Sequence, residues 1–363
     1  TSINSGQPSG RKNLIINGAM QVAQRGTSST SSGYFSVDRF TIINSGTDES
    51  PTQAQVDVSS GTTPYTLGFR KALKVTNGNQ TGGAGAADFI WIQHVIEAQD
   101  IATSGWNYTS SSSNITLSFW VKSSVAQDFK GYLRSRDGTN YEYPFATGAL
   151  TADTWTKITK TIPGNSNIQL DNDNGAGLEI NLFPFLGTDR TDGGTTENAW
   201  AAFNSAARTK DNTSTWYTTN DATLEITGYQ LEVGSTATDF EHRSFGEELE
   251  LCKRYYQVLI DGDNTTDSFG NATCYNSTSI HFVTPLRPEM RTVPTLDYTT
   301  GSDYYNAFQN NTNDTFDTWA LVGNSHSRAV DLMASSGVSV TSGASALLRI
   351  NNAASKIRFT AEL

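Results

Sequence analysis

Short runs in which apolar residues occupy every second position recur along most of this sequence. The clearest is ITLSFWVKSS at 115–124, where Ile115, Leu117, Phe119 and Val121 fall at alternate positions. Successive side chains of a β-strand point to opposite faces, so this spacing predicts a strand with one buried face. It constrains the fold strongly, because an amphipathic helix needs apolar residues three or four positions apart.

Similar runs, separated by clusters of Gly, Asn, Asp and Ser, continue over residues 13–241. They include WTKITKTIPG at 155–164 and ATLEITGYQLEVG at 222–234. Trp120 and Trp155 lie inside such runs, and we expect both in the core. The segment 167–187 reads as two strands joined by an Asn-Gly turn. Many short antiparallel strands over this length predict a β-sandwich, specifically a jelly roll.

Two segments have helical spacing instead. TENAWAAFNSAARTK at 196–210 places its aromatic and alanine residues on one helical face, so we expect a helix inserted in the sandwich. RSFGEELELCKRYYQ at 243–257 begins with Ser244 and Glu247, which fit a capping box, and continues as an amphipathic helix. After it, strand and turn patterns resume.

The organisation that follows is all-β: a jelly-roll β-sandwich, a short helix and a smaller C-terminal β-domain. Within the sandwich, NLIINGAMQ opens with a strand predicted at 14–16 and a turn at Asn17-Gly18. The predicted segments are an N-terminal arm at 1–12, the jelly-roll domain at 13–241, a linker helix at 242–256 and the C-terminal β-domain at 257–363.

Composition excludes several functions. The formal net charge is −11 and only 17% of the residues are charged, so the clustered Lys and Arg that nucleic-acid binding needs are missing. No apolar run approaches the length of a membrane span, so we expect no membrane insertion. Cys252 and Cys274 are too few for a disulfide-stapled domain, and we expect both to be free thiols.

Reactive groups do not form a recognisable catalytic set. The histidines His94, His242, His281 and His326 are scattered, and none has a partner at metal-ligand spacing. The acidic turn at 171–175 lacks the ligand spacing of a calcium loop. We therefore predict no cofactor, no metal site and no catalytic residues.

One catalytic alternative stays open. Glycosidases need only two carboxylates from distant strands, and Glu142, Glu179, Glu225 and Asp88 all lie in predicted strands. Two of them facing each other in an aromatic groove would support a polysaccharide depolymerase, although solvated acids are the simpler interpretation.

Aromatic residues give the candidate site. Trp200, Trp216 and Tyr217 lie among polar turn residues, close in sequence to Asp221. An exposed ring can stack on the apolar face of a sugar while nearby carboxylates and amides bind hydroxyls. We take these four as candidate sugar-binding residues. The alternative is that the rings only cover an edge of the sandwich.

Six stretches together resemble a known family. GRKNLIINGAMQVAQRG with GYFSVDRF opens the sequence, and IWIQHVIEAQD follows at 90–100. The most specific block is ITGYQLEVGSTATDFEHRSFGEELELCKRYYQ at 226–257, followed by FVTPLRPEMRTVPT at 282–295 and a terminal FTAEL. In this order they resemble modules of bacteriophage tail-fibre and related virion proteins.

The resemblance implies a jelly roll similar to carbohydrate-binding modules, followed by a C-terminal β-domain, in a virion appendage that is commonly trimeric. Sugar-binding relatives often carry paired Asp residues for a structural calcium in the last strand. Here the place reads Tyr229-Gln230-Leu231-Glu232, which argues against that metal. The family supplies no catalytic motif.

The function expected from the sequence is therefore a non-enzymatic phage virion protein, a tail fibre or spike, that recognises host cell-surface polysaccharide. Its expected partners are further copies of itself in a homotrimer, other virion proteins contacted through the N-terminal arm, and the host glycan. Its expected location is the outer surface of the virion, after assembly in the host cytoplasm. The alternative is a purely structural head fibre, decoration or adapter protein without a glycan ligand.

Overall fold

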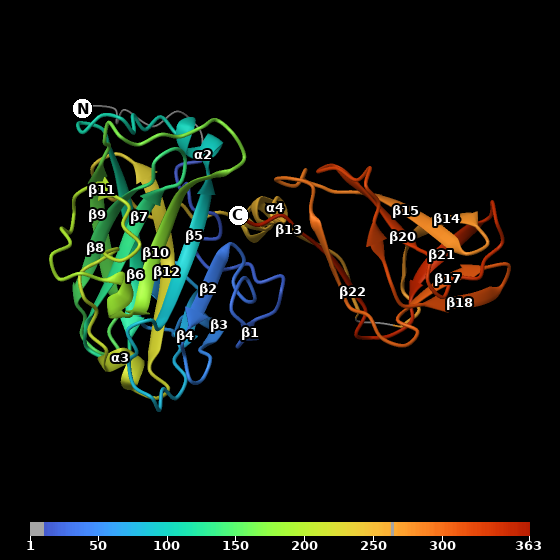
Figure 1. The fold of residues 1–363 in the computed structure, drawn as a ribbon, viewed down its shortest axis with the longest axis horizontal. Helices are drawn as coiled ribbons and strands as arrows, with labels where there is room; N and C mark the ends of the chain where they lie inside the picture. The colour runs from blue at the N-terminus through green and yellow to red at the C-terminus, as the bar shows by residue number, and fades with distance from the viewer. Residues whose placement is uncertain (1–10, 263–264) are drawn as a thin grey trace. The chain divides into compact units, whose positions relative to one another are not determined.

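The computed structural model describes residues 11–262 and 265–363. Its contacts divide the chain into two compact units (Figure 1). The larger unit runs to Glu248 and includes Leu363, and the smaller unit comprises Leu249–Glu362.

The first ten residues of the predicted arm at 1–12 lie outside the described part of the chain. The two basic residues that follow are bound to the larger unit. Arg11 forms an ion pair with Asp100 at 3.0 Å, and the ammonium of Lys12 donates to Thr238 Oγ1 at 2.7 Å. Both side chains are therefore bound to residues of the larger unit.

The first sheet of the larger unit has six strands. In spatial order they are β1 (Ser28–Ser29), β3 (Thr52–Asp57), β4 (Lys71–Thr76), β12 (Thr223–Val233), β6 (Asn114–Ser123) and β9 (Thr156–Pro163). All neighbouring pairs are antiparallel. In β6 the four apolar residues Ile115, Leu117, Phe119 and Val121 are fully buried, which confirms the predicted strand and its buried face.

The two tryptophans expected in the core lie on the outer side of this sheet instead. Trp120 and Trp155 are both half-buried, and they pack against a small apolar cluster around Phe69 and Ala72. In β6, Trp120 stands between the inward-facing Phe119 and Val121, so the alternation of the strand turns it outward.

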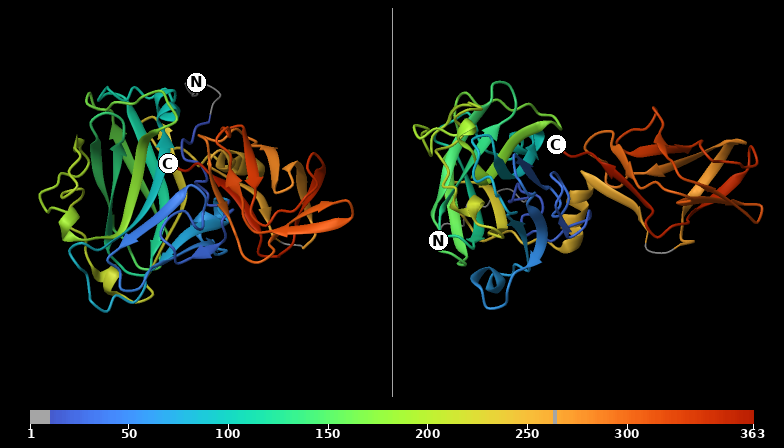
Figure 2. Two further views of the ribbon diagram at one scale, coloured as in Figure 1. Left: turned by 45° about the vertical axis from the view of Figure 1, so that its right-hand side comes forward. Right: turned by 60° about the horizontal axis from the view of Figure 1, so that its bottom comes forward.

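The second sheet also has six strands and packs against the first. In spatial order they are β11 (Ala201–Ala202), β8 (Tyr141–Ala149), β7 (Asp128–Ser135), β10 (Ala176–Leu186), β5 (Phe89–Glu97) and β2 (Phe40–Ser45). One hydrophobic core contains inward-facing residues of both sheets, for example Leu117 and Leu182. The strands of both sheets run in similar directions in Figure 1, and Figure 2 shows the same layers from two other sides. The predicted all-β jelly-roll sandwich is confirmed.

Short helical segments connect the strands of this sandwich. They are α1 (Thr63–Thr66), α2 (Ala98–Ala102), the 3₁₀ turn η1 (Thr188–Arg190) and α3 (Thr215–Thr218). Each is a single turn or little more, so the sheets carry the fold.

Polar residues from the start and the end of the larger unit form a clasp, defined as Asn13, Asn17, Glu241, Arg243 and Glu248. The backbone N–H of Asn17 donates to Glu248 Oε1 at 2.6 Å, and that of Asn13 donates to Glu241 Oε2 at 2.9 Å. Arg243 forms ion pairs with Glu241 at 2.6 Å and Glu248 at 3.3 Å. Since Glu248 is almost completely buried, its pairing with Arg243 compensates for the loss of hydration.

The turn predicted at Asn17 is present, and its side chain holds it in place. Asn17 has a φ of 61°, a left-handed conformation that Asn tolerates better than most residues. Its amide donates to the carbonyls of Val22 at 2.8 Å and Asp38 at 2.9 Å, and its Oδ1 accepts from the Val22 N–H. The strand predicted at 14–16 is wrong, because this segment is irregular and Ile15 donates to a side-chain oxygen instead of a ladder.

The helix predicted at 196–210 is also wrong. The segment is extended or turn-like, and Ala201–Ala202 pair with β8 as strand β11. Asn198 has a φ of 59°, which interrupts any helix, and the Trp200 indole donates to the carbonyl of Pro163 at 2.6 Å. These tertiary contacts prevail over a helical preference that is weak at each position.

The helix predicted after the sandwich is present as α4 (Phe245–Lys253), shorter than the predicted 242–256. Its capping box forms as predicted: the Ser244 N–H donates to Glu247 Oε2 at 2.8 Å, and the Glu247 N–H donates to Ser244 Oγ at 3.3 Å. The chain returns to strand at Tyr256.

The smaller unit is built from two antiparallel sheets around its own core. The three-stranded sheet contains β13 (Tyr256–Asp261), β22 (Lys356–Thr360) and β16 (Thr295–Tyr298). The seven-stranded sheet contains β18 (Thr312–Phe316), β17 (Tyr305–Gln309), β21 (Ser345–Ile350), β14 (Ser268–Asn276), β15 (Ser279–Pro285), β20 (Ala329–Ala334) and β19 (Ala320–Leu321). Cys274 lies in its core. Cys252 and Cys274 are both free thiols, as predicted, and both are buried.

Candidate functional site

Two of the four sequence-predicted sugar residues are buried in the core of the larger unit. Trp216 and Tyr217 on α3 both have 0% exposure. Tyr217 stacks on Phe185 with ring centroids 4.2 Å apart, and its hydroxyl donates to Asp88 Oδ2 at 3.1 Å. Neither ring has a face on which a sugar could stack, so both serve packing in this structure.

The other two are at separate places on the surface. Trp200 is half-buried and packs against Tyr143, with ring centroids 5.5 Å apart, while its indole N–H is bound to Pro163. Asp221 is exposed in the turn before β12, with a φ of 57°. The contacts of Trp200 and of Trp216 involve different neighbours, so the four residues do not form one site.

A different set of side chains gathers on the outer face of the second sheet, which we call the polar–aromatic face. Its members alternate with buried core residues along four adjacent strands. They are Glu142 of β8, Tyr132 and Arg134 of β7, Glu179, Asn181 and Phe183 of β10, and Trp91 and Gln93 of β5. The strand register arranges them in rows.

The first row consists of three charged side chains that lie directly across from one another. Arg134 pairs in register with Glu142 on one side and with Glu179 on the other. Neighbouring strands are about 4.8 Å apart, so one guanidinium lies between two carboxyl groups.

Glu179 is the centre of this face. It has 0% exposure and lies 2.7 Å from Arg134 Nε, and Arg136 forms a second, short ion pair with it. Tyr132 Oη donates to it at 3.1 Å, and the amides of Gln93 and Asn181 donate at 3.2 Å each. A buried carboxyl group that contacts this many donors is firmly held, so it fixes the orientation of the groups around it.

The second row contains the donors Tyr132, Asn181 and Gln93, in register across β7, β10 and β5. Tyr132 and Asn181 are buried, whereas Gln93 is half-buried. The Gln93 amide also lies 3.3 Å from Asn181 Oδ1. These groups form a hydrogen-bonded layer with one member accessible to solvent.

Aromatic rings form the next row. Trp91 stacks on Phe89 with ring centroids 4.4 Å apart, and it meets Phe183 edge-on at 6.1 Å. Trp91 is half-buried, and its buried indole Nε1 has no hydrogen-bond partner among the described residues. In this row the Trp91 indole is therefore held in place by Phe89 and Phe183, and its N–H makes no hydrogen bond with the described residues.

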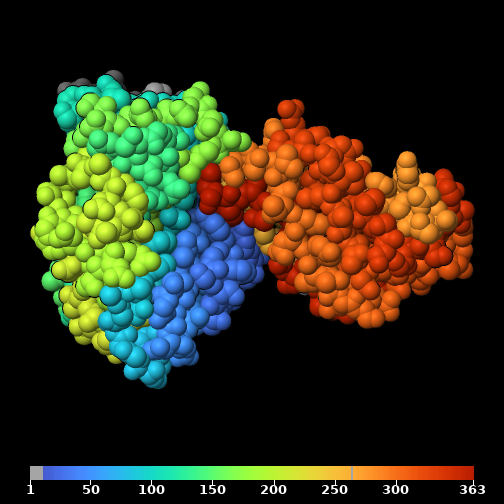
Figure 3. Space-filling model, in the orientation of Figure 1, coloured from blue at the N-terminus to red at the C-terminus, as the bar shows by residue number. Residues whose placement is uncertain are grey.

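The loop that follows β10, residues 187–212, packs against this face. We call it the insertion loop. Arg208 lies over the Trp91 ring, 5.3 Å from its centroid, and Arg134 lies 4.2 Å from the centroid of Phe203. Burial lowers the pKa of Arg208 from its ordinary value. In the space-filling view the yellow-green chain near residue 200 covers much of the visible surface of the larger unit (Figure 3).

Glu142 completes the face with an unusual carboxyl group. Its Oε1 accepts from the Asn204 N–H at 3.3 Å, while its buried Oε2 has no partner among the described residues. Burial raises the pKa of Glu142 to about 7, although Arg134 and Arg208 favour the charged form. At neutral pH this carboxyl group is therefore present in both forms, one of which can donate a hydrogen bond.

The two carboxyl groups of the face bear on the depolymerase alternative. Glu142 and Glu179 do share one face with aromatic rings, and their environments differ strongly. However, Arg134 lies between them, and Glu179 is buried and saturated by donors. In this arrangement Glu179 is a positioning group, since a nucleophile or base needs a free oxygen directed at the substrate.

No group of three or more His, Cys, Asp or Glu residues in the described part of the chain is arranged to hold a metal ion. Glu232 in β12 accepts from the Thr238 N–H at 2.9 Å and from Gln230 Nε2 at 2.8 Å. Its carboxylate is satisfied by the protein itself. No helix of the described residues is long and apolar enough to span a membrane.

Trp91 and Gln93 were not among the sequence-predicted site residues, although the sequence carries a local signal for both. In IWIQHVIE, Ile90 and Ile92 alternate with Trp91 and Gln93. Once the isoleucines are assigned to the core, the other two must face outward. The contribution of Glu179 could not be inferred in this way, because it depends on which strands are neighbours.

Comparisons with known proteins found related folds only at low similarity. No family model and no curated protein matches the sequence. A putative sugar binding protein from Bacteroides thetaiotaomicron is 12% identical over 61% of this chain and 100% of its own, with a TM-score of 0.32. The N-terminal cellulose-binding domain of a β-1,4-glucanase from Cellulomonas fimi is 13% identical over 60% of this chain and 99% of its own, with a TM-score of 0.29.

A third similar structure is the enzymatically active domain of tailspike protein 4 from bacteriophage CBA120. It is 10% identical over 61% of this chain, with a TM-score of 0.33, and this chain spans 21% of its length. At these TM-scores the matches carry no argument about the site, which rests on the residues of this chain.

Proposed function

We propose that this chain is a non-catalytic carbohydrate-binding protein and that the polar–aromatic face is its binding site. The observation that carries the proposal is the half-buried Trp91 beside the hydrogen-bonding row of Gln93 and Asn181, with the unpartnered oxygen of Glu142 on the same face. A pyranose has an apolar face that packs against exposed aromatic surface, here the part of Trp91 that Phe89 and Arg208 leave uncovered. Its rim of hydroxyls binds amides and carboxyl groups.

The rigidity of the face supports binding. Glu179 holds Arg134, Tyr132, Gln93 and Asn181 by hydrogen bonds or ion pairs before any ligand arrives. A site that is already ordered loses less conformational entropy when it binds.

The biological setting that we propose is the outer surface of a bacteriophage virion, where the chain would act as a tail fibre or spike that contacts host polysaccharide. This part rests on the sequence resemblance described above. A homotrimer assembled in the host cytoplasm would present three copies of a weak site, and multivalency can raise the overall affinity by orders of magnitude. The alternative is a structural head fibre, decoration or adapter protein without a glycan ligand.

The experiment is a binding titration of the purified chain with a panel of bacterial surface polysaccharides, each before and after periodate oxidation. We expect saturable binding to at least one intact polysaccharide and loss of binding after oxidation. Trp91→Ala should weaken binding at least tenfold, which corresponds to about 1.4 kcal/mol. Trp155→Ala is the matched control, because Trp155 is a half-buried tryptophan that packs against the outer side of the first sheet.

Two results would contradict the proposal. Equal binding by the Trp91→Ala variant would remove the polar–aromatic face as the site, and no binding to any intact polysaccharide would favour the purely structural alternative. Release of reducing ends during the titration, abolished by Glu142→Gln, would instead support the depolymerase.

A further inference from the structure

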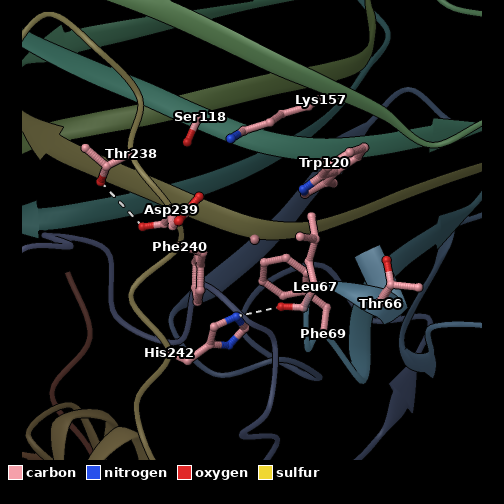
Figure 4. A pocket seen from close by; sticks show the side chains of 11 residues that line it. Thr66, Leu67, Phe69, Ser118, Trp120, Lys157, Thr238, Asp239, Phe240 and His242 are labelled. Atoms are coloured by element: carbon pink, nitrogen blue, oxygen red, sulfur yellow. Dashed lines mark hydrogen bonds between the residues drawn. The ribbon is translucent and has the colours of Figure 1, made fainter. Parts of the chain in front are cut away.

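A hollow lies on the side of the sandwich opposite the polar–aromatic face, on the outer face of the first sheet. It has a volume of about 380 Å³, within the range of small-molecule sites. Figure 4 shows its lining side chains, which come from β6 and β9, from the chain after β12, and from the segment around α1. We call it the Trp120 pocket.

The apolar part of the pocket is a cluster of rings. Phe69 and Phe240 meet edge-on with ring centroids 4.9 Å apart, and His242 lies 4.9 Å from Phe240. His242 Nε2 donates to the carbonyl of Leu67 at 2.9 Å, which fixes the orientation of the imidazole. Trp120 packs against the same cluster while remaining half-buried.

The backbone leaves room for the pocket at one glycine. Gly228 lies at an irregularity of β12 between Thr227 and Gln230, with a φ of 62°. A Cβ atom added there would lie 2.7 Å from Phe69 Cζ and 3.2 Å from Trp120 Cδ1. A side chain at this position would therefore collide with the rings of the pocket.

Four polar side chains of the pocket have no partners within the described part of the protein. The ammonium of Lys157, the carboxylate of Asp239 and the hydroxyl of Ser118 make no hydrogen bond or ion pair with any other described residue, and neither does the indole N–H of Trp120. Lys157 and Asp239 carry opposite charges and both line the hollow, yet they are not paired with each other (Figure 4). Three hydrogen-bond donors and one acceptor therefore lie around the aromatic cluster without partners among the described residues.

We propose that the Trp120 pocket binds a single pyranose residue, as a second carbohydrate site independent of the polar–aromatic face. The indole of Trp120 stacks on the apolar face of the ring, Asp239 accepts from sugar hydroxyls, and Lys157 and Ser118 donate to sugar oxygens. A purely apolar ligand, such as an aliphatic or phenyl side chain of a partner protein, would leave the charged groups unpaired against it, which is unfavourable.

The inference extends the proposed function without requiring that the polar–aromatic face be correct. If both are right, one chain carries a site on each side of the sandwich. The protein could then contact two polysaccharide molecules, or two segments of one polysaccharide. Because the two sites are linked, the overall affinity would rise.

The test uses the full chain carrying Trp91→Ala, so that the polar–aromatic face does not contribute. Methyl glucoside, methyl galactoside, N-acetylglucosamine and galacturonic acid are titrated separately and followed by saturation-transfer NMR. We expect saturable binding of at least one sugar, with a dissociation constant in the millimolar range typical of about −4 kcal/mol. Adding Trp120→Ala should weaken that binding at least tenfold.

A second variant protects the test against misfolding. Lys157 and Asp239 are exposed, so the double variant Lys157→Ala, Asp239→Ala should fold normally, and it should also weaken binding at least tenfold. Trp200→Ala is the matched control and should leave the titration unchanged, because Trp200 is a half-buried tryptophan that packs against Tyr143 and does not line the pocket.

The outcomes separate the two proposals. Sugar binding that survives Trp91→Ala and is lost with the Lys157, Asp239 double variant supports the pocket, whatever the polysaccharide panel shows for the polar–aromatic face. No saturable binding of any of the four sugars, or binding insensitive to both sets of variants, overturns it. Saturable binding of N-acetyl-tryptophanamide without binding of sugars overturns it in favour of a peptide ligand.

Discussion

Glu142 gives the sharpest prediction, because its environment couples a single proton to the stability of the larger unit. Burial raises its pKa from 4.5 to about 7. The folded protein therefore keeps this proton over a pH range in which the unfolded chain has released it. The stabilisation is complete below about pH 4.5 and is lost as pH rises through about 7.

The magnitude follows from the difference of about 2.5 pKa units, each worth about 1.4 kcal/mol. The upper limit is about 3.5 kcal/mol, and partial screening by solvent reduces it to roughly 2 kcal/mol. In a unit of this size each kcal/mol changes the melting temperature by about 2–4 °C. The expected effect is therefore roughly 4–8 °C between pH 4.5 and pH 8.

The change to make is Glu142→Gln, which resembles the protonated carboxyl group at every pH. Near pH 4.5 the variant and the parent should melt at similar temperatures. At pH 8 the variant should melt higher by the amount given above. Differential scanning calorimetry at several pH values measures both, and the difference between the two proteins cancels the titration of all other groups.

A melting difference that stays constant between pH 4.5 and pH 8 would contradict this prediction, because it would show that Glu142 titrates alike in the folded and unfolded states. A variant that becomes less stable as pH rises would reverse the sign and show that Arg134 and Arg208 outweigh burial. Either result would also remove the protonated carboxyl group from the chemistry of the polar–aromatic face.

Three further predictions concern the larger unit. Trp216→Ala should lower the free energy of unfolding by about 3–5 kcal/mol, measured by urea titration, because it empties a fully buried site; a loss below about 1 kcal/mol would place the indole outside the core. Asn17→Ala should be less stable than Asn17→Gly by about 1 kcal/mol in the same assay. Both variants lose the hydrogen bonds of the side-chain amide, but only alanine is strained at a φ of 61°. Equal stability of the two variants would show that the conformation is not strained. Glu179→Gln should cost about 3–5 kcal/mol, because two arginines lose their counter-charge, and a neutral effect in thermal unfolding would show that this carboxylate does not organise the face.

The alternation of Ile115, Leu117, Phe119 and Val121 is sufficient to predict a strand and its buried face, because the period of a strand is fixed by its backbone. The same pattern implies that Trp120 faces outward, whereas its apolar character favours the core, and the structure agrees with the pattern. Pattern therefore carries more information than residue type at this position.

Trp216 shows the opposite limitation. Its polar neighbours suggest an exposed turn, but α3 directs the two aromatic rings into the core and leaves the threonines outside. The helix predicted at 196–210 fails because Ala201–Ala202 find a strand partner in β8. In each case the deciding contact lies far away in the sequence, so local preference could not supply it.

The clasp also has a mechanical consequence. It joins the segment where the chain begins its path through the larger unit to the segment where that path ends, through Asn13, Asn17, Glu241, Arg243 and Glu248. Tension applied between these two segments would stretch several hydrogen bonds and ion pairs at once, in parallel. The load would then be carried across the clasp before it reached the strands, and the sheets would be the last part of the unit to yield.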